Sequence, residues 1–125
     1  MLSPDVRRLI VASPLTVPHV EAIVLMRASP QACFDVRTLA ARLYVPLKTA
    51  RRICADLQGL GVVADDADGK TLRYGPRTTE LAATLDRLAE AYSTNLVQVT
   101  RLIHSIGTPG AQAFADAFTL RKEPK

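Results

Sequence analysis

Cationic and hydroxyl side chains gather on one short segment of the chain. It carries two arginines, a lysine and a threonine within five positions: Lys48, Thr49, Arg51 and Arg52. An arginine guanidinium can donate to O6 and N7 of one guanine, while lysine and threonine bond to bases or to phosphates. Successive residues of a helix lie about 100° apart, so Arg51 and Arg52 cannot both face one groove. The segment is a candidate surface for a polyanion, with one arginine facing it and the other on a flank.

More cations lie on both sides of this segment. We expect Arg37 and Arg42, which precede it, to contact phosphates. Lys70 and Arg73, which follow it, are expected to reach the backbone or the minor groove of a duplex. For each of these residues taken singly, the alternative is a solvated surface charge.

Three carboxylates argue against contact at one point. Asp65, Asp66 and Asp68 lie within four residues and would repel phosphates. Either this segment turns away from a nucleic acid or it contacts none. An acidic segment of this kind is also compatible with a protein partner.

The charge of the chain is small and uneven. Its 125 residues suit one domain with an extension, and 48% of them are hydrophobic, which is enough for a core. The net charge is +4: residues 1–60 hold eight Lys or Arg and four Asp or Glu, whereas residues 61–125 hold eight of each. The surplus lies in the half with most of the candidate cations, and a phosphate backbone selects that sign. A mildly basic protein of another function would show the same total.

Two short helices must position these cations. The spacing predicts the first over about residues 36–43 and the second over about 47–58. Asp35 can cap the first by accepting from its free backbone N–H groups. Pro46, which has no N–H, separates the two helices. Their apolar residues recur every three or four positions, so each helix has one buried face; these residues are Leu39, Ala40, Leu43, Ala50, Ile53, Cys54 and Leu57.

A β-hairpin is predicted directly after the second helix, which Gly59 or Gly61 ends. Residues 60–66 and 71–75 have the pattern of strands. Asp68-Gly69 is a strong turn pair between them, because glycine accepts a positive φ without strain. Residues 32–34 are expected to form a short strand that pairs with the hairpin.

The two helices and the hairpin resemble a winged helix-turn-helix. The segments LAARLYV and TARRICADL match the usual register of the helix-turn-helix, and the hairpin stands where the wing follows. The chain looks like a small bacterial transcriptional regulator of the MarR/PadR-like dimeric type, over about residues 15–77. The resemblance implies a mainly α fold with a small β-hairpin wing, and a second helix that enters the DNA major groove. One departure is Pro46, at a position where Ser or Thr usually caps the second helix.

The resemblance also implies partners and an activity. We expect a DNA-binding transcriptional regulator that acts as a homodimer on double-stranded DNA, without catalysis. The alternative is a winged-helix protein–protein interaction module that binds no DNA. No pattern in the sequence predicts the operator, an effector, or whether the protein represses or activates.

The residues before this domain are expected to be helical. Residues 1–14 form a predicted arm with Ser3 as N-cap, which packs either on its own domain or across a dimer; its apolar face is Val6, Leu9 and Ile10. A helix from about Thr16 to Ala28 is apolar nearly all round, so we expect it to be buried. His19 lies at its start, where we expect it to be exposed. A solvated or capping role is favoured there over that of a metal ligand.

A long helix is predicted behind the wing, in a region, residues 78–125, that we expect to dimerise. A straight helix from Glu80 to Ser105 would be about 39 Å long, more than a small winged domain covers. The uncovered apolar stripe therefore predicts pairing with a second copy. The alternative is a helix that breaks near residues 93–95, which are weak helix formers, and folds back. The stripe consists of Leu81, Leu85, Leu88, Tyr92, Leu96, Val99, Ile103 and Ile106.

A last helix is predicted over about residues 108–120. Phe114 and Phe118, four residues apart, would share one face and anchor it. Residues 121–125 are expected to be solvated.

Signals for other classes of protein are missing. There is no glycine-rich phosphate loop, no nucleophile elbow and no Cys-x-x-Cys, so we expect neither an enzyme nor a cofactor or metal. Cys33 and Cys54 give no disulfide framework and fit a reducing cytoplasm. We expect them to be small core residues, with a redox sensor as the alternative. No apolar stretch reaches the ~20 residues of a membrane span, and we expect no signal peptide.

Overall fold

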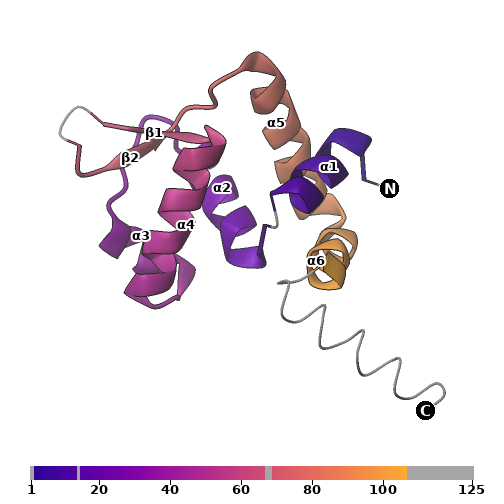
Figure 1. Ribbon diagram of the computed structural model, residues 1–125, viewed down its shortest axis with the longest axis horizontal. Coiled ribbons are helices and arrows are strands. Elements are labelled where there is room, and N and C mark those ends of the chain that lie inside the picture. The colour runs from indigo at the N-terminus through magenta and orange to yellow at the C-terminus, as the bar shows by residue number, and fades with distance from the viewer. Residues whose placement is uncertain (1, 14, 67–68, 107–125) are drawn as a thin grey trace, which may run out of the picture.

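The structure is a computed structural model that describes residues 2–13, 15–66 and 69–106. These residues form a helical protein with one β-hairpin, drawn in Figure 1. Along the chain the elements are α1 (Pro4–Ala12), α2 (Val17–Ala28), α3 (Val36–Leu43), α4 (Leu47–Leu60), β1 (Val63–Asp65), β2 (Leu72–Tyr74), α5 (Thr79–Thr94) and α6 (Leu96–Ile106). The predicted last helix, residues 108–120, lies outside the described residues.

The helix-turn-helix and its wing form as the sequence predicts. Asp35 caps α3, accepting from the backbone N–H of Thr38 at 2.7 Å. Pro46 precedes α4 and provides no side-chain cap, which is the departure expected from its missing oxygen. Strands β1 and β2 pair antiparallel. The strand expected before α3 is reduced to one bridge, in which Phe34 pairs with Leu72.

A single glycine ends α4. Gly61 has a φ of 81°, and a β-carbon there would lie only 3.0 Å from Nε of Arg77. Helix α4 therefore continues to Leu60, two residues beyond the predicted end, and turns at the position that only glycine fits without strain. The turn brings β1 back beside α4 and so sets where the wing begins.

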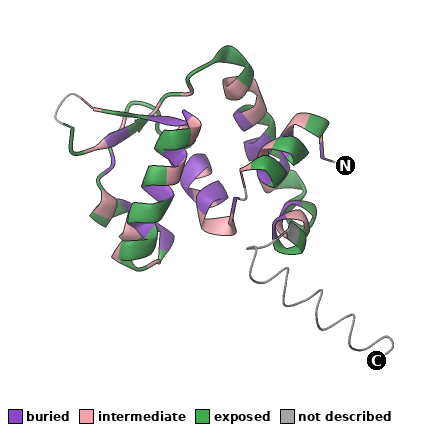
Figure 2. Ribbon diagram, viewed as in Figure 1, coloured by how far each residue is buried: buried purple, intermediate pink, exposed green. Residues whose placement is uncertain are grey.

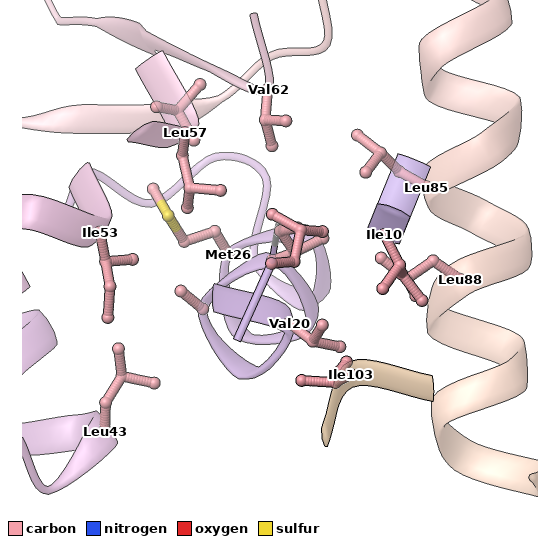
Figure 3. Close-up of a cluster of buried hydrophobic side chains, with 14 of the residues drawn as sticks. Ile10, Val20, Met26, Leu43, Ile53, Leu57, Val62, Leu85, Leu88 and Ile103 are labelled. Carbon is pink, nitrogen blue, oxygen red and sulfur yellow. The ribbon is translucent and has the colours of Figure 1, made fainter. Parts of the chain in front are cut away.

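Helix α2 lies at the centre of the core. Figure 3 shows Val20 and Met26 of α2 between Ile53 and Leu57 of α4 on one side and Leu88 of α5 on the other. All five are buried, with at most 2% of their surface exposed. Burying one such aliphatic side chain contributes about 1.5–3 kcal/mol. The all-round apolar character predicted for this helix is explained by neighbours on several sides.

The region behind the wing differs from the expected single long helix. Helix α5 ends at Thr94, Asn95 leaves the helical conformation at φ −130° and ψ 48°, and α6 begins at Leu96. The straight helix was therefore wrong, and the alternative break near residues 93–95 is what the chain adopts. Asparagine is a weak helix former, and its N–H still donates to the carbonyl of Ala91 at 2.6 Å.

This break changes what the apolar stripe does. Leu85, Leu88, Val99 and Ile103 are buried in the core of their own chain. The expectation of an uncovered stripe is wrong for these four residues, because folding α6 back covers them without a second copy. Leu81 and Tyr92 are half-buried, and Leu96 remains 48% exposed. The side chain of Ile106 lies outside the described part of the chain.

The N-terminal arm packs on its own chain. Helix α1 contacts α5 and α6 and buries Val6 and Ile10. Ser3 is the N-cap residue as predicted, but its hydroxyl donates to the Asp5 carboxylate at 2.5 Å and makes no capping hydrogen bond with a backbone amide. The division of the chain at residues 14 and 77 stays a prediction. Among the described residues, no helix is both long and apolar enough to cross a membrane.

Asp5 joins α1 to α5. Its carboxylate accepts from the Ser3 hydroxyl, from the Thr84 hydroxyl at 3.0 Å and from Nε of Arg87 at 2.7 Å, and Nη2 of Arg87 donates to it as well. The Arg87 guanidinium and the Ser3 hydroxyl hold the pKa of Asp5 well below its usual range. The ionised form therefore stabilises the folded arm.

We expect Asp5→Asn to lower the free energy of unfolding at pH 7. In acid, that free energy should also depend less on pH than in wild type. The pKa of Asp5 is lower in the folded chain than in the unfolded one, so its contribution is present above about pH 4 and is lost as the pH falls. Urea unfolding at pH 7, 5 and 3 gives the free energy of unfolding of the variant and of wild type. The difference between the two should become smaller as the pH falls. Arg87→Gln should remove the same pH-dependent part. A difference that stays constant with pH would contradict this role.

Candidate nucleic-acid interface

Helix α4 presents opposite faces to the core and to solvent. Its apolar side chains Ala50, Ile53, Cys54 and Leu57 are buried. Because these positions recur every three or four residues, the polar residues between them are turned outward. The predicted contact residues Lys48, Thr49, Arg51 and Arg52 are all exposed. Figure 2 shows that α4 carries both exposed and buried residues along its length.

Three of the predicted cations meet around one surface hollow. Arg37 from α3, Arg51 from α4 and Lys70 from the wing line a depression of about 290 Å³. Its remaining lining residues are Asp35, Val36 and Leu47. The hollow thus joins side chains from three separate elements, and Arg37 and Lys70 are 33 residues apart along the chain. Positive groups arranged in this way can hold an anion such as a phosphate.

The one carboxylate in this hollow is already engaged. Asp35 accepts from the first turn of α3, and the backbone N–H of Thr38 lowers the pKa of its carboxyl. Its negative charge is therefore directed at a helix N-terminus, where the amide dipoles compensate it. The cations around it outnumber it by three to one among the lining residues.

The other predicted contact residues lie apart from this hollow. Arg52 has Nε 3.6 Å from Oδ2 of Asp56, one turn along α4. Arg42 lines a second depression, of about 370 Å³, together with Glu21, Tyr44 and Tyr92. Arg73 is exposed in the middle of β2, opposite Ala64. The structure therefore brings Arg37, Arg51 and Lys70 together, whereas Arg42, Arg52 and Arg73 do not line this hollow.

The carboxylates of the wing differ in their surroundings. The carboxylate of Asp66 accepts from the Cys33 thiol at 3.2 Å and from the Thr71 hydroxyl at 3.5 Å. One of the three wing carboxylates is thus bound within its own chain. Asp65 is exposed on β1, and Asp68 lies outside the described residues.

The two cysteines differ in their surroundings. Cys54 is buried as expected, whereas Cys33 is exposed, so the expectation of a core residue is wrong for Cys33. The Asp66 hydrogen bond raises the pKa of the exposed Cys33 thiol, and burial raises the pKa of Cys54. A raised pKa leaves less of the nucleophilic thiolate at neutral pH. Both groups are therefore poorly suited to redox sensing by thiolate chemistry. Within the described residues, no three His, Cys, Asp or Glu side chains gather as metal ligands.

His19 is placed differently from its prediction. It is 7% exposed, so the expectation of an exposed residue was wrong, while the capping alternative is found. The backbone N–H of Thr16 donates to Nδ1 of His19 at 3.1 Å, which leaves Nε2 to carry the proton and donate to Asp56 at 2.9 Å. The capping-box spacing Thr16-x-x-His19 was a local signal for the first contact. No local signal announces Asp56, which is 37 residues away.

Comparison with known proteins supports the fold. No protein-family model matches the chain, and no curated protein matches it. A multiple antibiotic-resistance repressor (MarR) from Listeria monocytogenes is similar in structure, with 17% sequence identity over 95% of this chain and 81% of that one and a TM-score of 0.49. A mutant of MepR from S. aureus gives 14% identity, 96% and 88% coverage and a TM-score of 0.50.

The observed elements and the MepR likeness define the class. The chain has a winged helix-turn-helix fold that is mainly α with a β-hairpin wing, and its likeness to the MepR structure supports that fold. The fold class predicted from the sequence is confirmed. At this level of identity the likeness concerns the fold, so function must be argued from the residues of this chain.

One residue of the helix-turn-helix is held in a strained conformation. Tyr44 follows α3 with a φ of 58° and is the only non-glycine residue with positive φ in the described part of the chain. Its N–H donates to the carbonyl of Ala41 at 3.4 Å, and its side chain is 94% exposed. A β-carbon in this left-handed conformation costs roughly 1–2 kcal/mol.

We expect Tyr44→Asn to stabilise the protein by up to about 1 kcal/mol, because asparagine tolerates the left-handed conformation and little packing is lost. The free energy of unfolding in urea measures this. Tyr44→Phe keeps the strain and should leave stability unchanged. A loss of stability in Tyr44→Asn would show that the ring makes a contact that offsets the strain.

Proposed function

We propose that this protein is a DNA-binding transcriptional regulator that acts in the cytoplasm by occupying its site, without catalysis. The observation that carries the proposal is the meeting of Arg37, Arg51 and Lys70 on the exposed side of the helix-turn-helix. Each comes from an element that lies at the DNA surface in winged-helix proteins, namely the first helix, the recognition helix and the wing.

The side chains of this surface divide by the contacts they can make. Lys48, Thr49 and Arg51 are exposed on the first two turns of α4, whose early residues reach base edges in this class. Arg37 and Lys70, at the rim of the hollow, are placed to bind a phosphate of the same duplex. Arg42 and Arg73 lie further out and would contact flanking phosphates. Affinity should therefore depend strongly on salt, while the early residues of α4 supply the sequence preference.

We propose further that the protein is a homodimer. Val11 of α1 is 50% exposed, and Leu96 and Val97 of α6 are 48% and 63% exposed. Helices α1 and α6 pack on each other, so these apolar residues belong to one end of the molecule. In Figure 1 this end lies opposite the wing. A second copy that covers it would leave both α4 helices free for DNA, and Leu96 is the member of the predicted stripe that would take part.

Substitution of the cations that line the hollow should weaken the salt-dependent, electrostatic contribution to DNA affinity. We expect Arg37→Gln and Lys70→Gln each to make the slope of log K against log[salt] shallower by about 0.9. Arg51→Gln should also lower affinity by about 10–100-fold, because an arginine that reaches bases contributes about 1–3 kcal/mol. Fluorescence anisotropy with duplexes enriched from a random-sequence pool measures both quantities.

Arg101→Gln is the matched control for these variants. Arg101 is exposed on α6, at the other end of the molecule from the wing. Its substitution by glutamine removes the same charge as the variants in the hollow. It should change the slope far less. An absence of DNA binding by wild type at low salt, or equal effects of Arg51→Gln and Arg101→Gln, would overturn the proposal.

The dimer has a separate test. Val97→Glu places an unpaired charge in the proposed interface, and we expect the dimer dissociation constant to rise by at least about tenfold. Analytical ultracentrifugation across a concentration series measures this. Gln98→Glu adds the same charge at an exposed polar neighbour and should have a smaller effect. A wild-type monomer, or an unchanged dimer in Val97→Glu, would contradict this interface.

A further inference from the structure

The two adjacent arginines of α4 stand in different surroundings. Arg51 lines the hollow with Arg37 and Lys70. Arg52 instead has Nε 3.6 Å from Oδ2 of Asp56, and its side chain is 80% exposed. Arginine and aspartate four residues apart lie on the same face of a helix, so this pair runs along α4.

The Asp56 carboxylate is held in place by a second partner, so it cannot move freely with the Arg52 side chain. The same oxygen, Oδ2, accepts from Nε2 of His19 at 2.9 Å. The His19 side chain is only 9% exposed, and its other nitrogen receives the backbone N–H of Thr16 at the start of α2. A buried ring fixed at both nitrogens leaves its acceptor little room to turn. The carboxylate beside Arg52 is therefore positioned by α2 rather than by α4 alone.

We propose that Asp56, fixed by His19, is a positioning residue that determines DNA specificity by retaining Arg52 on the flank of α4. Arg51 is then the arginine presented to the bases. Any phosphate that binds Arg52 must compete with a carboxylate already in place. This inference rests on the proposed function, because it assigns roles within the same DNA surface.

The size of the effect follows from the exposure of the pair. Exposed ion pairs are weak and screened by salt, so Asp56 biases Arg52 without locking it. Removing the charge should raise affinity for random-sequence DNA by up to about fivefold. If Arg52 then binds one more phosphate, the salt slope should steepen by about 0.9.

The decisive variant is Asp56→Asn. The asparagine oxygen can still accept from Nε2 of His19, so the contact to α2 is retained while the charge facing Arg52 is lost. Asp86→Asn is the matched control, because it removes the same charge from an arginine–aspartate pair whose arginine, Arg27, belongs to α2. The probe is a random-sequence duplex, titrated by fluorescence anisotropy at several KCl concentrations.

We expect tighter binding and a steeper slope in Asp56→Asn and a smaller change in Asp86→Asn. Arg52→Gln added to Asp56→Asn should cancel the gain, whereas Arg52→Gln alone should change little. Affinity for the preferred sequence should rise less than affinity for random DNA, so the ratio between them should fall. Equal behaviour of the two Asp→Asn variants, or a gain that survives Arg52→Gln, overturns the inference while the proposed function stands.

A measurement without DNA separates the two proposals. Relaxation of the ¹⁵Nε nucleus of Arg52 reports how firmly its guanidinium is held. Its order parameter should fall in Asp56→Asn and stay the same in Asp86→Asn. If wild type bound no DNA, the proposed function would fail, and an unchanged order parameter in Asp56→Asn would overturn the positioning role independently.

Discussion

The burial of one face of α4 against α2 is the constraint on which the other features depend. Ile53 and Leu57 can be removed from water only when α4 lies in one rotational setting, and that setting turns Lys48 and Arg51 to solvent. Residues three and four apart must share a face, so the apolar pattern also decides where the charges go. The proposed DNA surface is therefore a consequence of how the core packs. The close approach at Gly61 then sets where the wing starts.

Around this core, charge-assisted hydrogen bonds connect elements that are distant in sequence. Asp5 joins α1 to α5, Arg27 joins α2 to Asp86 of α5, and His19 joins α2 to α4. Such bonds depend strongly on direction, so they specify how the helices are oriented even where their net stabilisation is modest. His19 bonds to the helix that carries the proposed contact residues, so in our proposal the link between α2 and α4 influences which arginine faces the DNA. The other two bonds hold α5 against α1 and α2.

That opposite end shows how a repeat can mislead. An apolar stripe with heptad-like spacing can be buried by a second copy of the chain. If the helix can turn back, it can equally be buried by the same chain. Asn95 provides the turn, and Leu88 and Ile103 then lie in one core. What remains for a partner is a smaller apolar area that includes Val97. In the proposed dimer, two subunits would therefore meet at this end with α5 and α6 of each already packed on one another.

The sequence by itself determined the helix-turn-helix, the hairpin that follows it and the buried face of each of the two helices. Asp35 as cap, Pro46 as separator and a hairpin with Gly69 at positive φ rest on local rules of backbone geometry, which act within a few residues. The tertiary structure alone decided which separate residues meet. The convergence of Arg37, Arg51 and Lys70, the contact of His19 with Asp56 and the return of α6 depend on how whole helices pack. Packing sums many weak contacts over long sequence separations, and no local pattern records that sum.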